Sequence, residues 1–417
     1  MNDSSRVNRR AHSANGQLTL PLNTIGASTR SAPVGRQHVV AGLFAGIGGI
    51  ELGLHRRGHR TALFCENEPT AMAVLSTRFP GVPLHSDVRS LKSLPRDTSL
   101  VTAGFPCQDL SQAGMTKGIA GTRSSLVGEV FRLIADSRVP WVLLENVPFM
   151  LQLGRGEAMN LIATTFERLG YRWAFRVVDS RAFGLPQRRR RVYFLATTEG
   201  DPRSVLFSDE YKAPDEPVKN GNAVACGFYW TEGLRGLGWA VDAVPTLKGG
   251  STIGIPSPPA IIMPDRSIVT PGIEDAERLQ GFPRNWTKPA ETVARPGARW
   301  KLVGNAVSVR AAAWIGRRLR HPGILREYQV SSLSKRKTWP TAAWNVGDGR
   351  VAVECSEWPV HSKYTSLETL LTVTKLRRLS AKATRGFLSR AGQGKLRFPD
   401  GFISAVEKHL RTVSKDE

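Results

Sequence analysis

Cysteine is scarce in this chain: 417 residues contain only four, at positions 65, 107, 226 and 355. The four lie far apart and form neither a CxxC pair nor a zinc-ligand spacing, which argues against a disulfide framework or a structural metal. No apolar run reaches about 18 residues, so no membrane-spanning helix is predicted. These absences together indicate a protein of a reducing compartment that is not held in a membrane.

Acidic residues are also in short supply, with 35 Asp and Glu against 58 Lys and Arg, a net charge of +23. Such an excess favours a polyanionic partner, most simply a nucleic acid, over a merely soluble basic surface. Residues 321–417 share the bias, with 17 basic and 9 acidic side chains. Residues 1–37 are polar and lack the apolar segment of a secretion signal, which predicts a disordered N-terminal arm.

A complete dinucleotide-binding fingerprint is absent, because Glu51 stands where G-x-G-x-x-G needs its last glycine. The apolar run 38–44 nevertheless predicts a strand, which a Gly-rich turn at 45–49 connects to a helix. The next predicted strand, 61–65, ends in Glu66, where a carboxylate can accept both ribose hydroxyls or simply lead the helix at 70–79. Asp87 is placed to contact an adenine ring or to cap a loop. Turn and carboxylate together favour an adenosine-bearing cofactor.

Cys107 is the candidate nucleophile. The apolar run 100–103 predicts a buried strand that ends at Gly104 and Pro106, so Cys107 follows on a loop at the ligand-binding edge of the sheet. Most free cysteines are instead small buried side chains. Another predicted strand, 141–144, ends in Glu145, which burial can hold protonated as an acid or which can serve as a cap.

Four consecutive arginines, 188–191, run into an apolar strand. Strand alternation predicts that Gln187, Arg189 and Arg191 share one face. A row of guanidinium groups suits phosphates and base edges, and a plain basic patch is the alternative. Residues 199–265 are rich in Gly and Pro and predict a small, β-rich or irregular unit. Helical patterning returns at 272–280 and again in a helix that runs through Leu319. Amphipathic helices are predicted between Leu367 and Leu388.

Taken in order, six motifs resemble those of the DNA cytosine carbon-5 methyltransferase family over roughly residues 38–320. They are Phe44-Ala-Gly-Ile-Gly-Gly49, Pro106-Cys-Gln-Asp-Leu-Ser111, Glu145-Asn-Val147, Gln187-Arg-Arg-Arg-Arg191, Arg278-Leu-Gln-Gly-Phe-Pro283 and Gly304-Asn-Ala-Val307. Two departures occur: residues 41–43 lack the Asp often found before the family's Phe, and Asp275 replaces a Glu.

The resemblance implies an α/β fold in which a Rossmann-like, mostly parallel sheet forms the catalytic domain. That domain would comprise 38–198 and 295–320, with a smaller target-recognition domain inserted at 199–294 and a basic C-terminal extension at 321–417. It implies DNA (cytosine-5-)-methyltransferase activity with S-adenosyl-L-methionine as methyl donor and no metal, acting on double-stranded DNA by base flipping.

The resemblance also implies a role for each motif residue. Cys107 attacks carbon 6 of the flipped cytosine, Glu145 holds the ring nitrogen, and Arg189 and Arg191 support the base and its sugar-phosphate. Gly104 and Pro106 shape the loop that aims Cys107. The implied cofactor residues are Phe44, Ala45, Gly46, Ile47, Gly48, Gly49, Glu66, Asn67, Asp87, Val88 and Asn305. The implied DNA-binding residues are Gln108, Ser111, Arg123 and Gln187.

The biological setting implied is the modification enzyme of a restriction-modification system. We expect a monomer of the bacterial cytoplasm or nucleoid, with a cognate restriction endonuclease acting separately. Three alternatives remain at this point: an RNA cytosine-5 methyltransferase, a nicotinamide-dependent oxidoreductase, and a non-catalytic DNA-binding relative. Testing DNA and RNA side by side as substrates would decide the first alternative. A hydride-transfer assay would decide the second.

Overall fold

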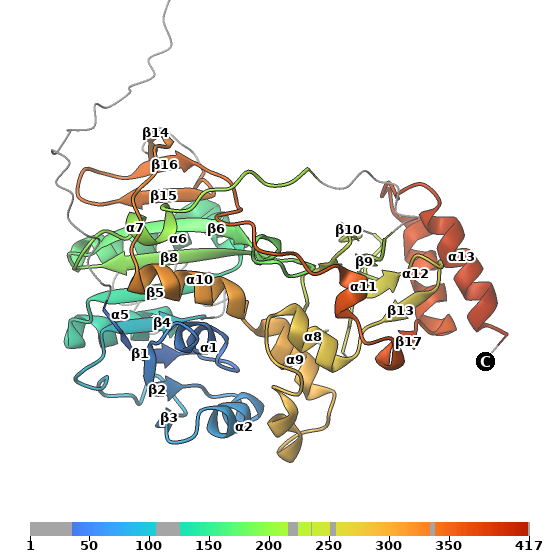
Figure 1. Cartoon of the computed structure of the whole chain (residues 1–417), viewed down its shortest axis with the longest axis horizontal. Coiled ribbons are helices and arrows are strands. Elements are labelled where there is room, and N and C mark those ends of the chain that lie inside the picture. Colours follow the sequence, from blue (N-terminus) through green and yellow to red (C-terminus); the bar gives the residue numbers. More distant parts are fainter. Residues whose placement is uncertain are drawn as a thin grey trace, which may run out of the picture.

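The computed structural model describes residues 36–105, 126–215, 224–234, 236–250, 256–333 and 338–415. It is built around a ten-stranded sheet with the order β14-β16-β15-β6-β8-β5-β4-β1-β2-β3 (Figure 1). The strands are β1 (Val39–Leu43), β2 (Arg60–Cys65), β3 (Leu84–His85), β4 (Leu100–Ala103), β5 (Trp141–Asn146), β6 (Arg172–Asp179), β8 (Arg190–Thr197), β14 (Gln329–Ser332), β15 (Ala342–Asn345) and β16 (Val351–Glu354).

Most strands between residues 39 and 197 of this sheet run in one direction. β3, β2, β1, β4 and β5 pair in parallel. β8 is antiparallel to β5 and to β6, so it alone is reversed among these seven. The predicted α/β class with a Rossmann-like, mostly parallel sheet is confirmed. The predicted first strands agree closely with β1, β2, β4 and β5, because each is an apolar run buried on both faces.

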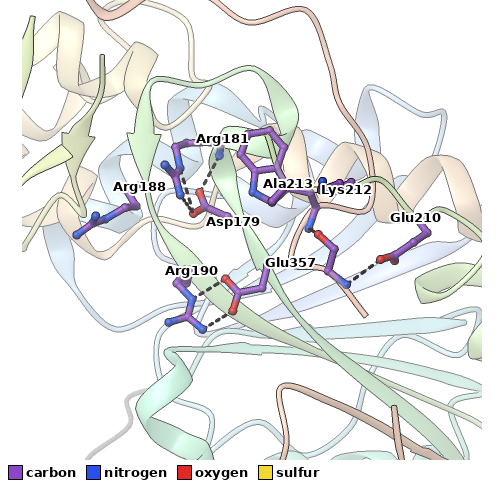
Figure 2. Close-up of a pocket in the computed structure, with 10 residues that line it drawn as sticks. Asp179, Arg181, Arg188, Arg190, Glu210, Lys212, Ala213 and Glu357 are labelled. Atoms are coloured by element: carbon purple, nitrogen blue, oxygen red, sulfur yellow. Dashed lines mark hydrogen bonds and ion pairs between the residues drawn. The ribbon is translucent and has the colours of Figure 1, made fainter. Parts of the chain in front are cut away.

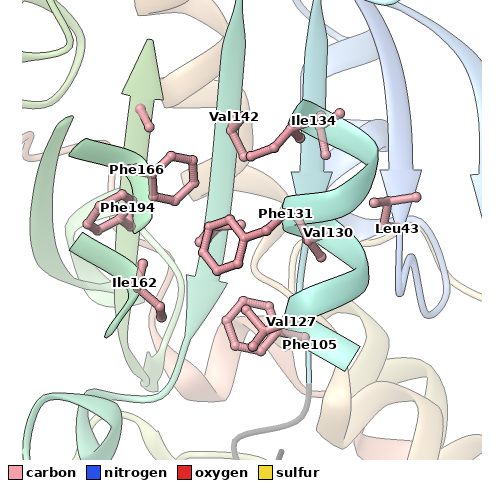
Figure 3. Close-up of a cluster of buried hydrophobic side chains, with 14 of the residues drawn as sticks. Leu43, Phe105, Val127, Val130, Phe131, Ile134, Val142, Ile162, Phe166 and Phe194 are labelled. Carbon is pink, nitrogen blue, oxygen red and sulfur yellow. The ribbon is translucent and has the colours of Figure 1, made fainter. Parts of the chain in front are cut away.

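Helices cover both faces of the sheet. α5 (Leu126–Ser137) and α6 (Glu157–Arg168) pack on one face, where α5 buries Val127, Val130, Phe131 and Ile134 (Figure 3). This i, i+3, i+4, i+7 spacing places all four on one side of the helix. The opposite face is covered by α1 (Gly49–His55), α7 (Arg203–Leu206) and α10 (Val309–Arg320).

The contact between α1 and α10 depends on a glycine. A Cβ atom on Gly53 would lie 2.6 Å from the Cβ of Ala312 and 2.6 Å from the carbonyl oxygen of Val309. Any larger residue would push the helices apart. This close approach joins the Gly-rich turn after β1 to residues more than 250 positions later, so it brings Val307 beside Gly49.

A second, five-stranded sheet has the order β10-β9-β12-β13-β17. Its strands are short, and all but β17 lie between residues 226 and 270. They are β9 (Cys226–Phe228), β10 (Ala240–Val241), β12 (Ala260–Ile262), β13 (Ile268–Thr270) and β17 (Arg377–Arg378). The helices α8 (Ile273–Leu279) and α9 (Ala298–Asn305) come next after β13, and α2 (Pro69–Arg78) lies earlier in the chain, between β2 and β3.

The C-terminal extension joins both sheets. β15 pairs antiparallel with β6, so β14–β16 lengthen the large sheet, whereas β17 pairs with β13 of the small one. α11 (Leu367–Leu370), α12 (Ala381–Gln393) and α13 (Phe402–Val413) lie beside the small sheet (Figure 1). Phe387 and Phe402 are fully buried against Phe228. The extension is therefore an integral part of the packed structure.

Candidate active site

Three of the predicted strand-end segments meet at one edge of the large sheet. Gly104 follows β4, Glu145 lies near the end of β5, and Phe44 follows β1. A Cβ placed on Gly104 would lie 3.7 Å from Oε2 of Glu145 and 3.9 Å from the carbonyl oxygen of Phe44. The methyl Cγ2 of Val307 is 4.0 Å from the same point. Gly104 thus stands at the centre of the site.

Cys107 is three residues beyond Gly104 and lies outside the described residues, as do Pro106, Gln108, Ser111 and Arg123. The last described residue before them, Phe105, is held in place by β5. The side-chain Nδ2 of Asn146 donates a hydrogen bond to the carbonyl oxygen of Phe105 at 3.1 Å. Sequence reasoning did not single out Asn146, although it stands beside Glu145 in a quoted motif.

Glu145 and Arg191 form a buried ion pair, with 3.0 Å between Oε1 and Nε. The two residues are 7% and 9% exposed. Burial raises the pKa of Glu145, although the positive charges of Arg191 and Arg189 oppose that rise. The carboxyl group therefore takes up a proton more readily than an exposed glutamate does.

The arginine motif is not one continuous strand, so the prediction of a single strand is wrong. β7 (Gln187–Arg188) pairs with β11 (Val244–Pro245), Arg189 lies between strands, and β8 begins at Arg190. Pairing with β11 draws the first two residues toward the segment that leads to the small sheet. A local alternation pattern cannot predict this pairing between distant segments.

Arg189 is buried and donates hydrogen bonds to backbone carbonyls. Its acceptors are Leu247 at 3.2 Å, Gly304 at 3.3 Å and Ala306 at 2.5 Å. Burial lowers its pKa to about 9, so the guanidinium remains charged near neutral pH. Gln187 also reaches Leu247, whose amide donates to Oε1 at 3.1 Å. Both predicted residues therefore bind segments outside the arginine motif, at Leu247 and, for Arg189, at the end of α9.

The Gly-rich turn has the backbone expected of a cofactor loop. Phe44, Gly46 and Gly48 have φ values of 52°, 55° and 76°. The amide of Gly46 donates to Oε2 of Glu66 at 2.7 Å, and the amide of Glu68 donates to Oε1 at 2.8 Å. Because a carboxylate offers about four acceptor positions, Glu66 retains room for two ribose hydroxyls. The residues present thus fit an adenosine-bearing group.

The other predicted cofactor residues divide by exposure. Partly or fully exposed are Ala45, Asn67, Asp87 and Asn305. Ile47 is buried, and its carbonyl oxygen accepts from the indole of Trp286 at 2.9 Å. The prediction also includes Gly48, Gly49 and Val88, which are buried. Gly48 and Gly49 belong to the turn itself, whereas Val88 packs in the hydrophobic core after β3.

Beside the Arg191 end of the site is a cavity of about 940 Å³, in which acidic and basic groups alternate (Figure 2). Arg181 pairs with Asp179 at 3.0 Å, and Arg190 donates to Glu357 of the extension at 2.6 Å. Arg188 and Lys212 also line it. The extension therefore supplies an acidic partner directly to the arginine motif.

Within the described ranges, no cluster of three or more His, Cys, Asp or Glu side chains has the arrangement of a metal site. In the same part of the chain, no helix is sufficiently long and apolar to cross a membrane.

Comparisons with known proteins agree with this geometry. Residues 39–225 match the family model of the C-5 cytosine-specific DNA methylase. The chain is 49% identical over 382 residues to the Type II methyltransferase M2.BsuMI of Bacillus subtilis, which covers 88% of this chain and 97% of that protein. It is 31% identical over 302 residues to M1.ScrFI of Lactococcus lactis, covering 64% and 74%.

A solved structure, the Dnmt2 methyltransferase of S. pombe, superposes with a TM-score of 0.46 and 17% identity, covering 68% of this chain and 98% of that one. The sequence matches, together with the meeting of Gly104, Glu145 and the Gly-rich turn, lead to one conclusion. The chain belongs to the family of C-5 cytosine-specific DNA methylases and is a DNA (cytosine-5-)-methyltransferase.

Proposed function

We propose that Cys107 and Glu145 carry the reaction of this methyltransferase on a cytosine flipped out of duplex DNA. The observation that carries this proposal is the buried Glu145–Arg191 pair beside Gly104, three residues before Cys107. Flipping is required because carbon 6 of a stacked cytosine cannot be reached by a side chain. A thiolate suits the task, since its addition to carbon 6 is reversible.

The proposed steps conserve atoms and charge. The Sγ thiolate of Cys107 adds to carbon 6 while Glu145 gives a proton to the ring nitrogen, so the electron pair of the double bond becomes available at carbon 5. Carbon 5 then accepts the methyl group, whose bond to the sulfonium sulfur of the donor would break and leave a neutral thioether. A base removes the carbon-5 proton, the double bond re-forms and Cys107 leaves as the thiolate. Glu145 recovers its proton from the ring nitrogen, which fits its raised pKa.

S-Adenosyl-L-methionine supplies the methyl group when it is bound. We infer that Glu66 holds the ribose hydroxyls, that Asp87 and Val88 lie against the adenine, and that the turn 44–49 with Asn67 and Asn305 encloses the rest. The free acceptor positions of Glu66 and the left-handed backbone of Gly46 and Gly48 support this assignment. The partly exposed carboxylate of Asp87 supports the second contact.

The arginines take different parts in this proposal. Arg191 orients Glu145 through the ion pair and contacts the flipped nucleotide. Arg189 acts through the C-terminal end of α9, which it holds against the site by hydrogen bonds to the carbonyls of Gly304 and Ala306. The DNA contacts proposed for Gln108, Ser111 and Arg123 concern residues outside the described ranges.

The biological role we propose is modification in a restriction-modification system. The relatives named above are Type II methyltransferases, which supports this role and a bacterial setting. A cognate endonuclease would cut the same unmethylated sequence. Failure to find such an activity in the source cells would argue against the role without affecting the chemistry.

The decisive test is bisulfite sequencing of plasmid DNA from a methylation-free host that expresses this chain. Protected cytosines are expected at one recurring sequence, and none with Cys107→Ala, while binding of S-adenosylmethionine stays near the parent level. Protection that persists with Cys107→Ala would overturn the assignment of the nucleophile. A folded parent protein that protects no cytosine would overturn the proposed activity at DNA.

A further inference from the structure

A second cavity, of about 660 Å³, lies apart from the catalytic edge. Its walls come from the end of α1, the outer side of α10, the helix η3 (Ser180–Phe183) and residues 360–363 of the C-terminal extension. Buried Phe183 and Trp314 line it, with ring centroids 5.8 Å apart. Its lining includes no residue to which catalysis or cofactor binding has been assigned above.

The charge of this cavity is of one sign. It is lined by Arg56, Arg57, Arg310, Arg317 and Lys363, all of which are exposed, and none of the described residues that line it is acidic. Arg317 does reach one carboxylate from outside the lining, Asp209 at 3.3 Å. Within the described part of the chain, Arg57 and Lys363 form no ion pair.

The cavity near Arg191 provides the contrast. There, Asp179 and Glu357 neutralise Arg181 and Arg190 (Figure 2). Here, Arg56 and Arg310 have lowered pKa values because each is partly desolvated and faces another cation, Arg57 for the first and Arg56 for the second. The uncompensated repulsion is a cost that a bound anion would remove.

Two of the arginines are held in place by backbone carbonyls. Arg310 donates to the carbonyl oxygen of Phe183 at 3.0 Å, and Arg56 donates to that of Gly281 at 3.3 Å. These bonds use some of the five N–H donors on each guanidinium and leave others for a ligand. The arrangement is therefore partly preorganised for anion binding.

We propose that this cavity is a second DNA-contact site, outside the catalytic edge, which binds phosphate groups of the duplex backbone. The inference rests on the DNA substrate of the proposed function. A duplex carries one negative charge per about 1.7 Å of its axis, so it offers several phosphates to cations that are spread over three chain segments. A single small anion would leave much of the cavity empty and most of the cations unneutralised.

The variant to test is the double substitution Arg57→Gln and Lys363→Gln. Neither side chain makes an ion pair within the described structure, so the substitution breaks none there. Lys408→Gln with Arg411→Gln on α13 removes the same two charges from exposed positions elsewhere. Arg57→Lys with Lys363→Arg retains both charges. Equal melting temperatures for all proteins would establish that each is folded.

The measurement is the dependence of duplex affinity on salt concentration, using the full-length chain and both a short and a long duplex. Each lost phosphate contact lowers the slope of log K against log salt by about 0.9, so a loss of about 2 is expected for the first variant. The charge-retaining variant should restore the parent slope, and the α13 variant should keep it. Methyl transfer to the short duplex should remain at the parent rate.

Slopes equal to that of the parent at both lengths would overturn the proposal. It would also be overturned if calorimetry showed that the first variant loses affinity for inorganic phosphate or pyrophosphate while its DNA slope is unchanged. Methylation separates this result from the proposed function: a parent protein that methylates DNA, combined with unchanged slopes, leaves the activity intact and removes only the second site.

Discussion

The two sheets of this molecule are assembled in different ways. Between β1 and β8, the large sheet is made of strands whose apolar runs, turns and helices follow one another in the sequence. The small sheet joins strands from residues 226–270 to β17 at 377–378, and two of the three fully buried phenylalanines in its core come from α12 and α13. The first region therefore keeps its catalytic groups in local motifs, whereas the second depends on contacts between distant segments.

The largest expected effect concerns the catalytic edge. Glu145→Gln should keep the shape of the side chain but lose the exchangeable proton, so kcat should fall by roughly 10²–10⁴-fold. Cofactor affinity should change little, whereas loss of the buried ion pair with Arg191 should lower the melting temperature. Steady-state methyl transfer across a range of pH checks this. If the variant retained the parent rate and pH profile, Glu145 would have no role in proton transfer.

Matched cavity mutations would sharpen the contrast between the sheets. Phe166 in the large sheet's core and Phe387 in the small one are both fully buried. Each Phe→Ala change should cost about 3–5 kcal/mol of unfolding free energy. Phe166→Ala should impair cofactor binding, but Phe387→Ala should impair DNA binding and leave cofactor binding near normal. Loss of cofactor binding in both variants would show that the two regions unfold together.

A buried carboxyl group gives the large sheet a predicted pH dependence. Glu51 on α1 accepts from the hydroxyl of Thr102 at 2.6 Å, and burial raises its pKa from 4.5 to about 7. Between these values the folded state binds more protons than the unfolded state, so stability should fall as pH rises from about 4.5 to 7. The expected contribution is roughly 3 kcal/mol.

Denaturant titrations of the parent and Glu51→Gln at several pH values would measure this contribution. The variant should lose that part of the pH dependence because glutamine does not titrate. An identical pH dependence in both proteins would contradict the assignment to Glu51.

The smallest expected effect concerns the link between the extension and the arginine motif. Arg190 and Glu357 form an ion pair whose arginine side chain is 48% exposed. Arg190→Gln should therefore cost under about 1 kcal/mol, and less at high salt. Thermal unfolding at low and high salt would test it. A cost of several kcal/mol would mean that this pair, rather than β15 and β17, holds the extension in place.

Much of the site's framework was predictable because it is local. The strand predicted at 100–103 has those bounds, since a short apolar run decides them. Glu145 and Gly104 were placed at strand ends for the same reason. The role of Asn146 was not predicted, because its hydrogen bond reaches Phe105, which lies 41 residues earlier in the sequence.

The sequence alone determined the family, the α/β class, the candidate nucleophile and the polyanionic partner, because short motifs and net charge carry that information. Only the tertiary structure decided that Arg189 faces the carbonyls of residues 247, 304 and 306. It also decided that β7 separates from β8 and that the extension belongs to both sheets. Such pairings depend on which distant strands form hydrogen bonds with each other, and a local pattern of side chains does not specify that.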